Sequence, residues 1–482
     1  MKPLIPAAFT VGLLCLTAPV HAQPAPTPPG PPRPAPPGAE QPATPETSDD
    51  PSEVSTMPSV AGSLPNPDPG GIRASLGERG ITYGLTYIGE GLGNVSGGIR
   101  RGAIYQGRLD AQLDVDFEKL AGLPGLGFHA NAYQIHGRGL SGCCLGNVLI
   151  ASGIEARATT RLYELWLEQT LWDGRVALRA GQIGADTEFF VSQYATLFVN
   201  ASFGWPALGA TDLPGGGPAY PLAALGARLK LAPARGVTVL AAVFNGDPAG
   251  PGSDPQGNNP SGTNFRTGDP PLVLAEIAYA YNRGRGASGL PGTIKLGGYH
   301  HFGRFDDLRY GPNGLALNDP TAPGVARRLR GESGVYAVLD QLVRREPGTR
   351  DQGLGVFLRV SASPSDSSPL SFYADGGVTY KGLLPGRVND TLGLGVAYAR
   401  FSRAARGSDR DAARFGVGSG LVRSSEAVVE LSYQAEIVPG FTVQPDAQYI
   451  IRPGGRIANP RDPNGGAIKN AAVLGLRATV RY

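Results

Sequence analysis

The sequence predicts an all-β fold, a transmembrane antiparallel β-barrel of sixteen strands, and three observations predict it. Gly makes up 71 of the 482 residues and Pro another 44, which helical bundles do not tolerate. Many segments alternate apolar and polar residues with a period of two, so each has one apolar and one polar face. These segments run for about 9–13 residues, close to the about 9–11 that a tilted membrane strand needs. Strands of soluble proteins average about 5–6 residues.

Composition and charge exclude several other classes of protein. The chain carries 43 Lys and Arg against 40 Asp and Glu, so it lacks the basic excess of a nucleic-acid binder. Three Cys are too few for a disulfide scaffold. No apolar run of about 20 residues follows the first 22, which excludes a helical membrane protein.

The N-terminal region divides into two segments. Residues 1–22 have a basic start at Lys2, a short apolar core and a small residue at Ala22, which indicates a secretory signal peptide cleaved after Ala22. Residues 23–70 include 16 Pro and are otherwise mostly small or polar, so we expect a disordered Pro-rich linker. Two interpretations of this segment stay open: it is a periplasmic tether, or it is an inert leader. Residues 71–482 are then the barrel.

The alternation is clearest in two segments. Leu109, Ala111, Leu113, Val115 and Phe117 alternate with polar residues. The same holds from Ala427 to Ile437, where Val428 is the one apolar residue on the polar side. Sixteen such segments can be counted: 81–89, 108–118, 126–136, 161–171, 175–183, 222–232, 236–245, 271–282, 292–302, 333–344, 353–363, 369–380, 390–400, 424–437, 440–452 and 470–482.

The connections and the aromatic residues favour a barrel in a membrane over a soluble sandwich. Short turns alternate with long loops, 364–368 being a short exception, and this is typical of outer-membrane barrels. Tyr residues recur near segment ends on the apolar face, as in an interfacial girdle: Tyr83, Tyr87, Tyr163, Tyr279, Tyr281, Tyr398, Tyr433 and Tyr449. Closure in lipid satisfies every backbone hydrogen bond. The terminal Tyr482 suits recognition by the barrel-assembly machinery, with outer-membrane lipid around the wall.

Sixteen strands leave an aqueous bore rather than a filled interior. The predicted inner face carries both signs of charge, so no strong ion filter is expected: Asp110, Asp114, Glu164, Glu168, Arg179, Arg228, Lys230, Glu276, Lys295, Arg359, Asp375, Glu430 and Arg477. The Pro-rich leader is too poor in apolar residues to fold as a plug. Adjacent Cys143 and Cys144 could form only a strained ring, a vicinal disulfide.

Several motifs resemble the OprB-type carbohydrate-selective porins. They are Asn94–Ala103, Tyr105–Asp110, Arg161–Gln169, Glu188–Ser192, Phe203–Pro206, Val243–Pro248, and Gln444–Asp446 leading to Tyr449–Gly455. These motifs occur in the order given and are spread over nearly all of the chain from Ile81 to Tyr482. The resemblance implies a passive sixteen-stranded outer-membrane channel of a Gram-negative bacterium. It implies carbohydrate as substrate and no cofactor, and a homotrimer is a possible assembly.

The loop 184–221 is the expected constriction, because it is long and unusually rich in aromatic residues for an exposed loop. Docking on neighbouring loops or on a trimer partner is the alternative. Trp166, expected to point inward between Glu164 and Glu168, is the best candidate for stacking on a sugar, with Arg179 on the next strand. A bracing role for a Glu–Arg pair is equally open. The candidate substrate-binding residues are Glu164, Trp166, Glu168, Arg179, Glu188, Phe189, Phe190, Trp205 and Arg228.

Arg outnumbers Lys by 37 to 6, which suits hydrogen bonding to neutral polyols, although coding bias explains it as well. The His residues show no metal-ligand spacing, and neither a nucleotide loop nor a nucleophile elbow stands out, so no enzyme is expected. Two alternatives stay open: a non-selective general porin, and a barrel-anchored enzyme or adhesin acting through its outer loops. A soluble secreted β-sandwich is more remote.

Overall fold

A computed structural model describes residues 63–64, 68–283, 289–349, 352–364 and 366–482. The expected signal peptide 1–22 lies outside the described residues, as does most of the expected linker 23–70. Among the described residues, no helix has the length and apolar character needed to cross a bilayer.

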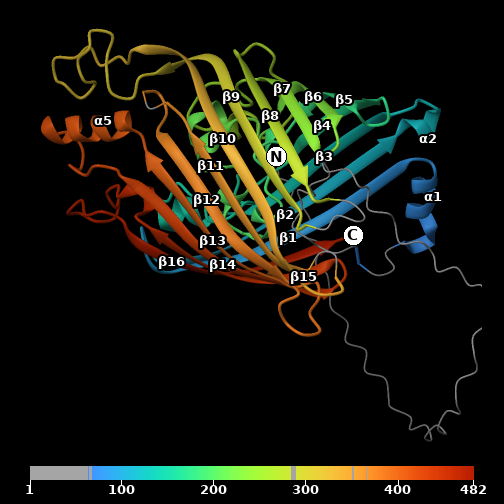
Figure 1. Ribbon diagram of the computed structural model, residues 1–482. Coiled ribbons are helices and arrows are strands. Elements are labelled where there is room, and N and C mark those ends of the chain that lie inside the picture. Colours follow the sequence, from blue (N-terminus) through green and yellow to red (C-terminus); the bar gives the residue numbers. More distant parts are fainter. Residues whose placement is uncertain (1–62, 65–67, 284–288, 350–351, 365) are drawn as a thin grey trace, which may run out of the picture. The chain divides into compact units, whose positions relative to one another are not determined.

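Sixteen antiparallel strands form one closed barrel, in which each strand pairs with its neighbours in sequence and β1 pairs with β16 (Figure 1). The strands are β1 (Ile81–Gly98), β2 (Gly102–Asp116), β3 (Leu126–Gly137), β4 (Thr159–Leu171), β5 (Val176–Ile183), β6 (Ala224–Ala234), β7 (Val237–Asn245), β8 (Pro271–Tyr281), β9 (Gly292–Asp306), β10 (Arg328–Arg345), β11 (Gly353–Ala362), β12 (Leu370–Lys381), β13 (Thr391–Phe401), β14 (Ser425–Val438), β15 (Phe441–Ile451) and β16 (Lys469–Arg481). The predicted number of strands and the closed antiparallel fold are confirmed.

Short helices lie before the barrel and in its connections. They are η1 (Pro69–Gly71), α1 (Ile72–Glu78), α2 (Phe117–Ala121), η2 (Ser141–Leu145), η3 (Ala185–Thr187), η4 (Ala195–Leu197), η5 (Ala201–Phe203), α3 (Ala207–Asp212), η6 (Pro214–Gly216), α4 (Pro255–Asn258), α5 (Arg403–Arg414) and η7 (Pro453–Gly455). Cys143 and Cys144, within η2, form a disulfide with each other.

Two local expectations were wrong. The first segment does not end at residue 89, because β1 continues to Gly98 and meets β2 through the short connection 99–101. Glycines in this stretch hide the alternation from the sequence. Tyr163 is not on the outer face: β4 bulges there, since Asn131 pairs with Glu164 and Ala132 with Leu162. The extra residue turns the Tyr163 ring inward, where it is buried.

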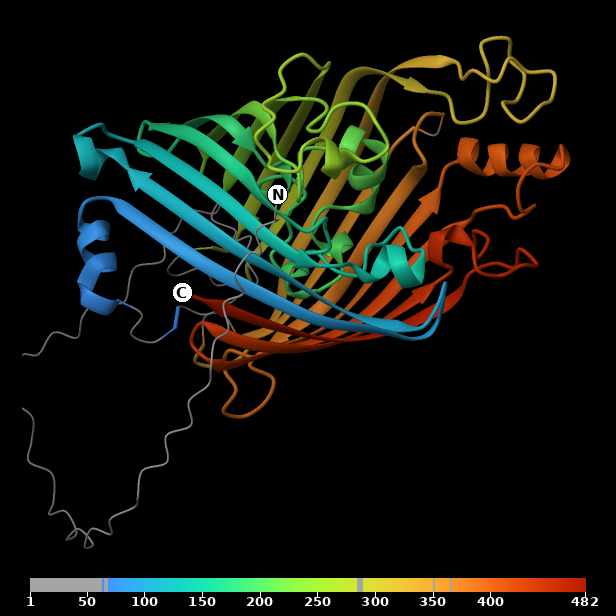
Figure 2. The ribbon, with the colours of Figure 1, turned by 180° about the vertical axis from the view of Figure 1, so that it is seen from behind.

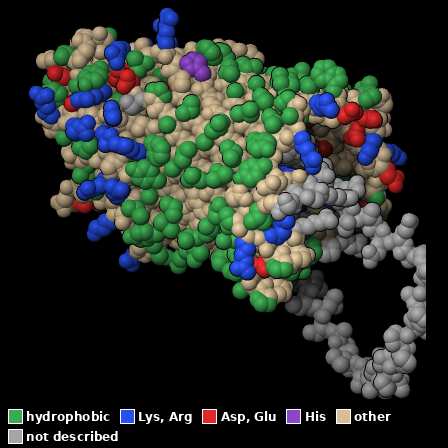
Figure 3. All heavy atoms as spheres, viewed as in Figure 1, with side chains coloured by type: hydrophobic (Ala, Val, Ile, Leu, Met, Phe, Trp, Pro, Cys, Tyr) green, Lys and Arg blue, Asp and Glu red, His purple; other side chains and the backbone are tan. Residues whose placement is uncertain are grey.

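The outer wall of the barrel is apolar. Successive outward side chains such as Leu394 and Val396 on β13, or Ile277 and Tyr279 on β8, are exposed around the perimeter. Figure 3 shows these side chains as a broad band of hydrophobic surface over the strands. A soluble protein would not expose so continuous a patch, and a membrane barrel requires it.

The hydrophobic core lies inside the barrel. The connection 184–223 between β5 and β6 folds inward (Figure 2), and its Leu197, Phe198 and Phe203 pack into one buried cluster with the inner faces of the later strands. Val428 belongs to this cluster and has 0% exposure. Val428 therefore does point inward, as its place in the alternation predicts. It is apolar because this part of the inner wall packs against the loop.

Glycines on the inner face of β13 make room for that loop. A Cβ atom on Gly393 would lie 2.4 Å from Leu197 Cδ2, and one on Gly395 would lie 2.8 Å from Phe203 Cζ. The close approach of loop and wall thus depends on residues without side chains at these two positions.

The double substitution Gly393→Ala with Gly395→Ala should lower the stability of the barrel by about 1–3 kcal/mol, because two added methyl groups overpack the interior. Thermal unfolding of the detergent-solubilised protein, followed by its heat-dependent mobility on gels, would measure this. Gly91→Ala is the control, since a Cβ there meets nothing within 4 Å. Equal unfolding midpoints for the double variant and the control would contradict the packing described here.

Candidate functional site

Buried charged side chains of the barrel wall hold the loop 184–223 across the lumen. Glu430 on β14 accepts hydrogen bonds from the backbone N–H groups of Val199 (2.5 Å) and Asn200 (3.1 Å). Asp340 on β10 accepts from the Ser192 hydroxyl at 2.5 Å and the Gln193 N–H at 3.1 Å. Part of the inner-face charge predicted to line water is therefore used to satisfy the backbone of the loop.

Arg359 on β11 is the most heavily used of these anchors. Its guanidinium binds Asp375 of β12 at 2.6 Å and also donates to the carbonyl oxygens of Ser202 (2.8 Å) and Gly204 (2.7 Å). Both Arg359 and Asp375 are buried. The fork of five N–H donors explains why Arg stands here, since a Lys could not bind a carboxylate and several carbonyls in one plane.

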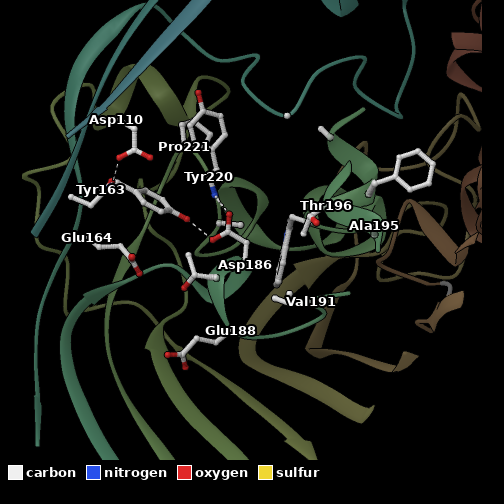
Figure 4. Close-up of a pocket in the computed structure, with 18 of the residues that line it drawn as sticks. Asp110, Tyr163, Glu164, Asp186, Glu188, Val191, Ala195, Thr196, Tyr220 and Pro221 are labelled. Carbon is white, nitrogen blue, oxygen red and sulfur yellow. Dashed lines mark hydrogen bonds between the residues drawn. The ribbon is translucent and has the colours of Figure 1, made fainter. Parts of the chain in front are cut away.

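The two ends of the loop are joined to each other and to β4. Asp186 accepts a hydrogen bond from the Tyr163 hydroxyl and another, at 2.9 Å, from the backbone N–H of Tyr220 (Figure 4). Glu164 accepts from the Gly184 N–H at 2.9 Å. Burial raises the pKa of Asp186 above its ordinary value. The inward turn of Tyr163 thus has a structural use, because the Tyr163 hydroxyl donates to Asp186 where the two ends of the loop meet. This meeting point of Tyr163, Asp186 and Tyr220 is called the neck of the loop.

An open cavity of about 880 Å³ remains between the loop and the wall formed mainly by β2–β9. No described residue of β10–β15 lines this cavity, because the loop and the apolar cluster occupy that side, so the passage is off-centre. In the close-up of Figure 4, Glu164 from the wall and Glu188 from the loop both direct their carboxylates toward the same space. Seven of the nine predicted site residues line the cavity: Glu164, Trp166, Glu168, Arg179, Glu188, Trp205 and Arg228.

Four of these residues form one ionic network that joins the loop to the wall. Glu168 on β4 binds Arg179 of β5 at 2.9 Å and Arg228 of β6 at 2.7 Å. Glu188 of the loop binds the same two guanidinium groups, at 2.7 Å and 2.5 Å. The charges cancel in pairs, so the network presents polar groups of both signs to the cavity without a large net field.

Trp166 is held between side chains from the two neighbouring strands. The guanidinium carbon of Arg179 on β5 lies 3.6 Å from the ring centroid, and the His129 ring of β3 stacks at 4.8 Å with an interplanar angle of 20°. Since β3 and β5 lie on opposite sides of β4, these contacts cover the two faces of the indole. The indole Nε1 is buried and has no hydrogen-bond partner among the described residues, so Trp166 lines the cavity through the remaining part of its edge.

Phe189 and Phe190 do not belong to the cavity surface. Their exposures are 1% and 2%, and Phe190 stacks on Tyr336 of β10 at 3.6 Å. Burial of this extent leaves no ring face for a ligand. The expectation that they contact substrate is therefore corrected, and they anchor the loop to the wall instead.

Two residues at the site were missed from the sequence. His129 also contacts Asp114 at 2.6 Å, and only its position opposite Trp166 in the β3–β4 register could have indicated its role. Arg108 lies over the rings of Tyr133 (4.6 Å) and Tyr220 (5.0 Å). No sequence pattern brings Tyr220 of the loop to this place. Among the described residues, no cluster of His, Cys, Asp and Glu side chains could hold a metal.

A closed sixteen-stranded barrel, apolar outside and narrowed by an inward loop around a charged cavity, defines an outer-membrane channel protein. The sequence model of the carbohydrate-selective porin family, OprB, matches residues 100–482. The chain belongs to this family. It is therefore a porin of the bacterial outer membrane rather than an enzyme.

Individual relatives agree with this assignment. Porin B of Pseudomonas aeruginosa is 25% identical over 414 residues, which cover 80% of this chain and 86% of that protein. The high-pH structure of Pseudomonas putida OprB has a TM-score of 0.74 at 24% identity, covering 86% of this chain and 97% of that one. Its low-pH structure has a TM-score of 0.52 at 18% identity over the same shares. The two structures show the likeness of the fold.

The carboxyl group of Asp212, in α3 of the loop, predicts a pH dependence of stability. One oxygen accepts from the Leu370 N–H at 3.1 Å, and the other has no partner in the described part of the chain. Burial, reinforced by nearby Glu332, raises the pKa of Asp212 well above its ordinary value. A raised folded-state pKa means that its contribution to stability is complete below about pH 4, the unfolded pKa, and is lost as the pH rises through the folded pKa.

Asp212→Asn, which cannot ionise, should therefore match the wild type near pH 4 and have the higher unfolding midpoint at pH 9. Heat-dependent gel mobility across this range would measure the difference. Asp319→Asn is the control, because the hydrogen bonds from Thr321 lower the pKa of Asp319, so both its folded and unfolded forms are ionised above about pH 4. Parallel pH curves for Asp212→Asn and the wild type would show that Asp212 does not titrate as described.

Proposed function

We propose that this porin passes carbohydrates by passive diffusion and holds each sugar weakly in the cavity between the loop 184–223 and the wall of β3–β6. The single observation that carries the proposal is the network of Glu168, Arg179, Glu188 and Arg228 beside Trp166. It is a set of planar donors and acceptors, fixed in place, at the point where the loop narrows the lumen.

The chemistry of the network suits a neutral polyol. Guanidinium and carboxylate groups each offer two parallel hydrogen-bonding positions, which match pairs of neighbouring hydroxyl groups. Because each charge is already paired, a permeating ion gains little from either sign, and a sugar can exchange bonds with the network as it passes. Weak binding at such a site is compatible with transport, since the ligand must also leave.

An apolar surface for the C–H face of a sugar lies on the same cavity. Trp166 contributes its edge, and Trp205 lies on the loop, with its Nε1–H donating to the Gly216 carbonyl at 3.0 Å. Since His129 and Arg179 cover the faces of Trp166, its proposed role is to fix these two groups at the cavity as much as to touch the sugar directly.

Three further proposals concern the rest of the chain. Residues 1–22 would be removed as a signal peptide, 23–70 would serve as a linker, and 71–482 would form the porin. Tyr482, whose ring stacks on Tyr83 at 6.2 Å, would be the residue read by the barrel-assembly machinery. Assembly as a homotrimer stays a prediction.

Ion current through the protein in a planar bilayer should fall in a saturable way as glucose or a maltooligosaccharide is added, because bound sugar occupies the narrowed passage. Titration at constant salt, with the added viscosity matched by a large polymer that cannot enter, would measure it. Current unchanged at saturating sugar would leave only a general porin. A lack of sugar influx into liposomes would instead favour a barrel that acts through its outer loops.

Trp166→Ala should weaken sugar block about fivefold, the equivalent of about 1 kcal/mol for a lost aromatic and cation–π contact, with similar ion conductance. Trp172→Ala is the matched control, since Trp172 lies in the connection between β4 and β5 and is 72% exposed. The measurement is the sugar titration of each variant. An unchanged affinity for Trp166→Ala would remove Trp166 from the site.

A further inference from the structure

The helix α5 carries a row of Arg residues on one face. Arg403, Arg406 and Arg410 are spaced by three and four positions, which places them side by side on a helix. Figures 1 and 2 both place α5 at the end of the barrel opposite the C-terminus, the end of the long loops. The row therefore lies on the outer rim of the barrel, away from the cavity described above.

The acidic residues of α5 do not neutralise this row. Asp409 is bound by Arg423 at 2.7 Å, and Asp411 is bound by Arg309 at 2.6 Å. Both partners lie outside the helix. Both carboxylates are thus paired with Arg residues of other segments, and these two ion pairs fix α5 at the rim of the barrel.

A fourth Arg places the row at the edge of the lipid-facing wall. On β13 the outward side chains are Leu394, Val396, Tyr398 and Arg400 in order toward the outer rim. The first two are exposed apolar residues, and Tyr398 stands where an interfacial aromatic is expected. Arg400 comes next, at the depth of lipid headgroups, and the chain then enters α5.

These four guanidinium groups share one electrostatic environment. Partial burial, with the repulsion of Arg400, Arg410 and Arg403, lowers the pKa of Arg406. No carboxylate among the described residues binds any of the four. A second pair of Arg residues lies further around the barrel, where exposed Arg304 of β9 and Arg330 of β10 are directly opposite each other. Like charges in such positions repel, so both places favour an external anion.

We propose that Arg400, Arg403, Arg406 and Arg410 form a binding surface for the phosphate groups of lipid headgroups in the outer leaflet. Guanidinium binds phosphate through two parallel, charge-assisted hydrogen bonds. A row of four such groups next to a lipid-facing apolar wall fits an amphiphile whose phosphates sit at the interface and whose chains pack below. Figure 3 shows Lys and Arg gathered at this end of the barrel, next to the hydrophobic band.

The test measures binding of bisphosphorylated lipid A to the purified protein in non-ionic detergent by native mass spectrometry. The wild type should bind it about tenfold more tightly than fully dephosphorylated lipid A, because only the phosphate groups offer the guanidinium groups charge-assisted hydrogen bonds. The variant with all four Arg changed to Gln should lose this preference. Inorganic phosphate at millimolar concentration should not displace the lipid.

The matched control changes four exposed Arg in the connections and strand ends at the opposite end of the barrel to Gln: Arg175, Arg235, Arg345 and Arg481. Heat-dependent gel mobility and bilayer conductance verify that both variants are folded channels. The proposal is overturned if the four-residue variant binds like this control, if dephosphorylated lipid A binds equally well, or if inorganic phosphate competes as a free anion. If the variant with all four Arg changed does not fold, the double variant Arg403→Gln with Arg410→Gln is measured instead. It should lose part of the preference for bisphosphorylated lipid A.

Discussion

The packing of the loop 184–223 against the inner wall of β10–β15 is the constraint on which the rest of the structure depends. Sixteen strands enclose a lumen too wide for its own side chains to fill. The loop fills one side of it with a buried apolar cluster that includes Phe198, Phe203 and Val428. What remains open is a passage along the other side, so the position of the polar site follows from where the apolar packing ends.

Buried charges make that packing specific. A buried ion pair such as Arg359–Asp375 contributes little net stability, because the loss of hydration offsets most of the attraction. Its contribution here is geometric, since the same guanidinium fixes loop carbonyls. An apolar loop on an apolar wall could slide, whereas one whose backbone is bound at Glu430, Asp340 and Arg359 has a single position. The loop can then present Glu188 to the wall with the accuracy that paired hydrogen bonding requires.

The sequence predicted the barrel well and the site in part, for a physical reason. The alternation along segments such as Ala427–Ile437 is a direct consequence of one face meeting lipid, so all sixteen strands could be found. The pattern fails where that cause is absent. Glycines between Ile81 and Gly98 have no side chains to alternate, and a bulge at Tyr163 reverses the phase.

Most of the predicted lining residues reach the cavity, because they lie on strands of known phase. Phe189 and Phe190 were misplaced because period two does not apply within a loop, and the stacking of His129 on Trp166 depends on a cross-strand register that no local motif specifies.

The neck formed by Asp186, Tyr163 and Tyr220 has a consequence for how porins of this architecture can diversify. Asp186 lies near the start of the loop and Tyr220 near its end, and the hydrogen bond between them closes the intervening chain into a nearly separate unit. Closing a somewhat longer or shorter unit costs little additional entropy. Insertions or deletions between these two residues, at positions that the wall does not bind, would then leave the pairing of β5 with β6 undisturbed. Evolution could change the width of the bore through those parts of the loop that the wall does not bind, while the barrel stays the same.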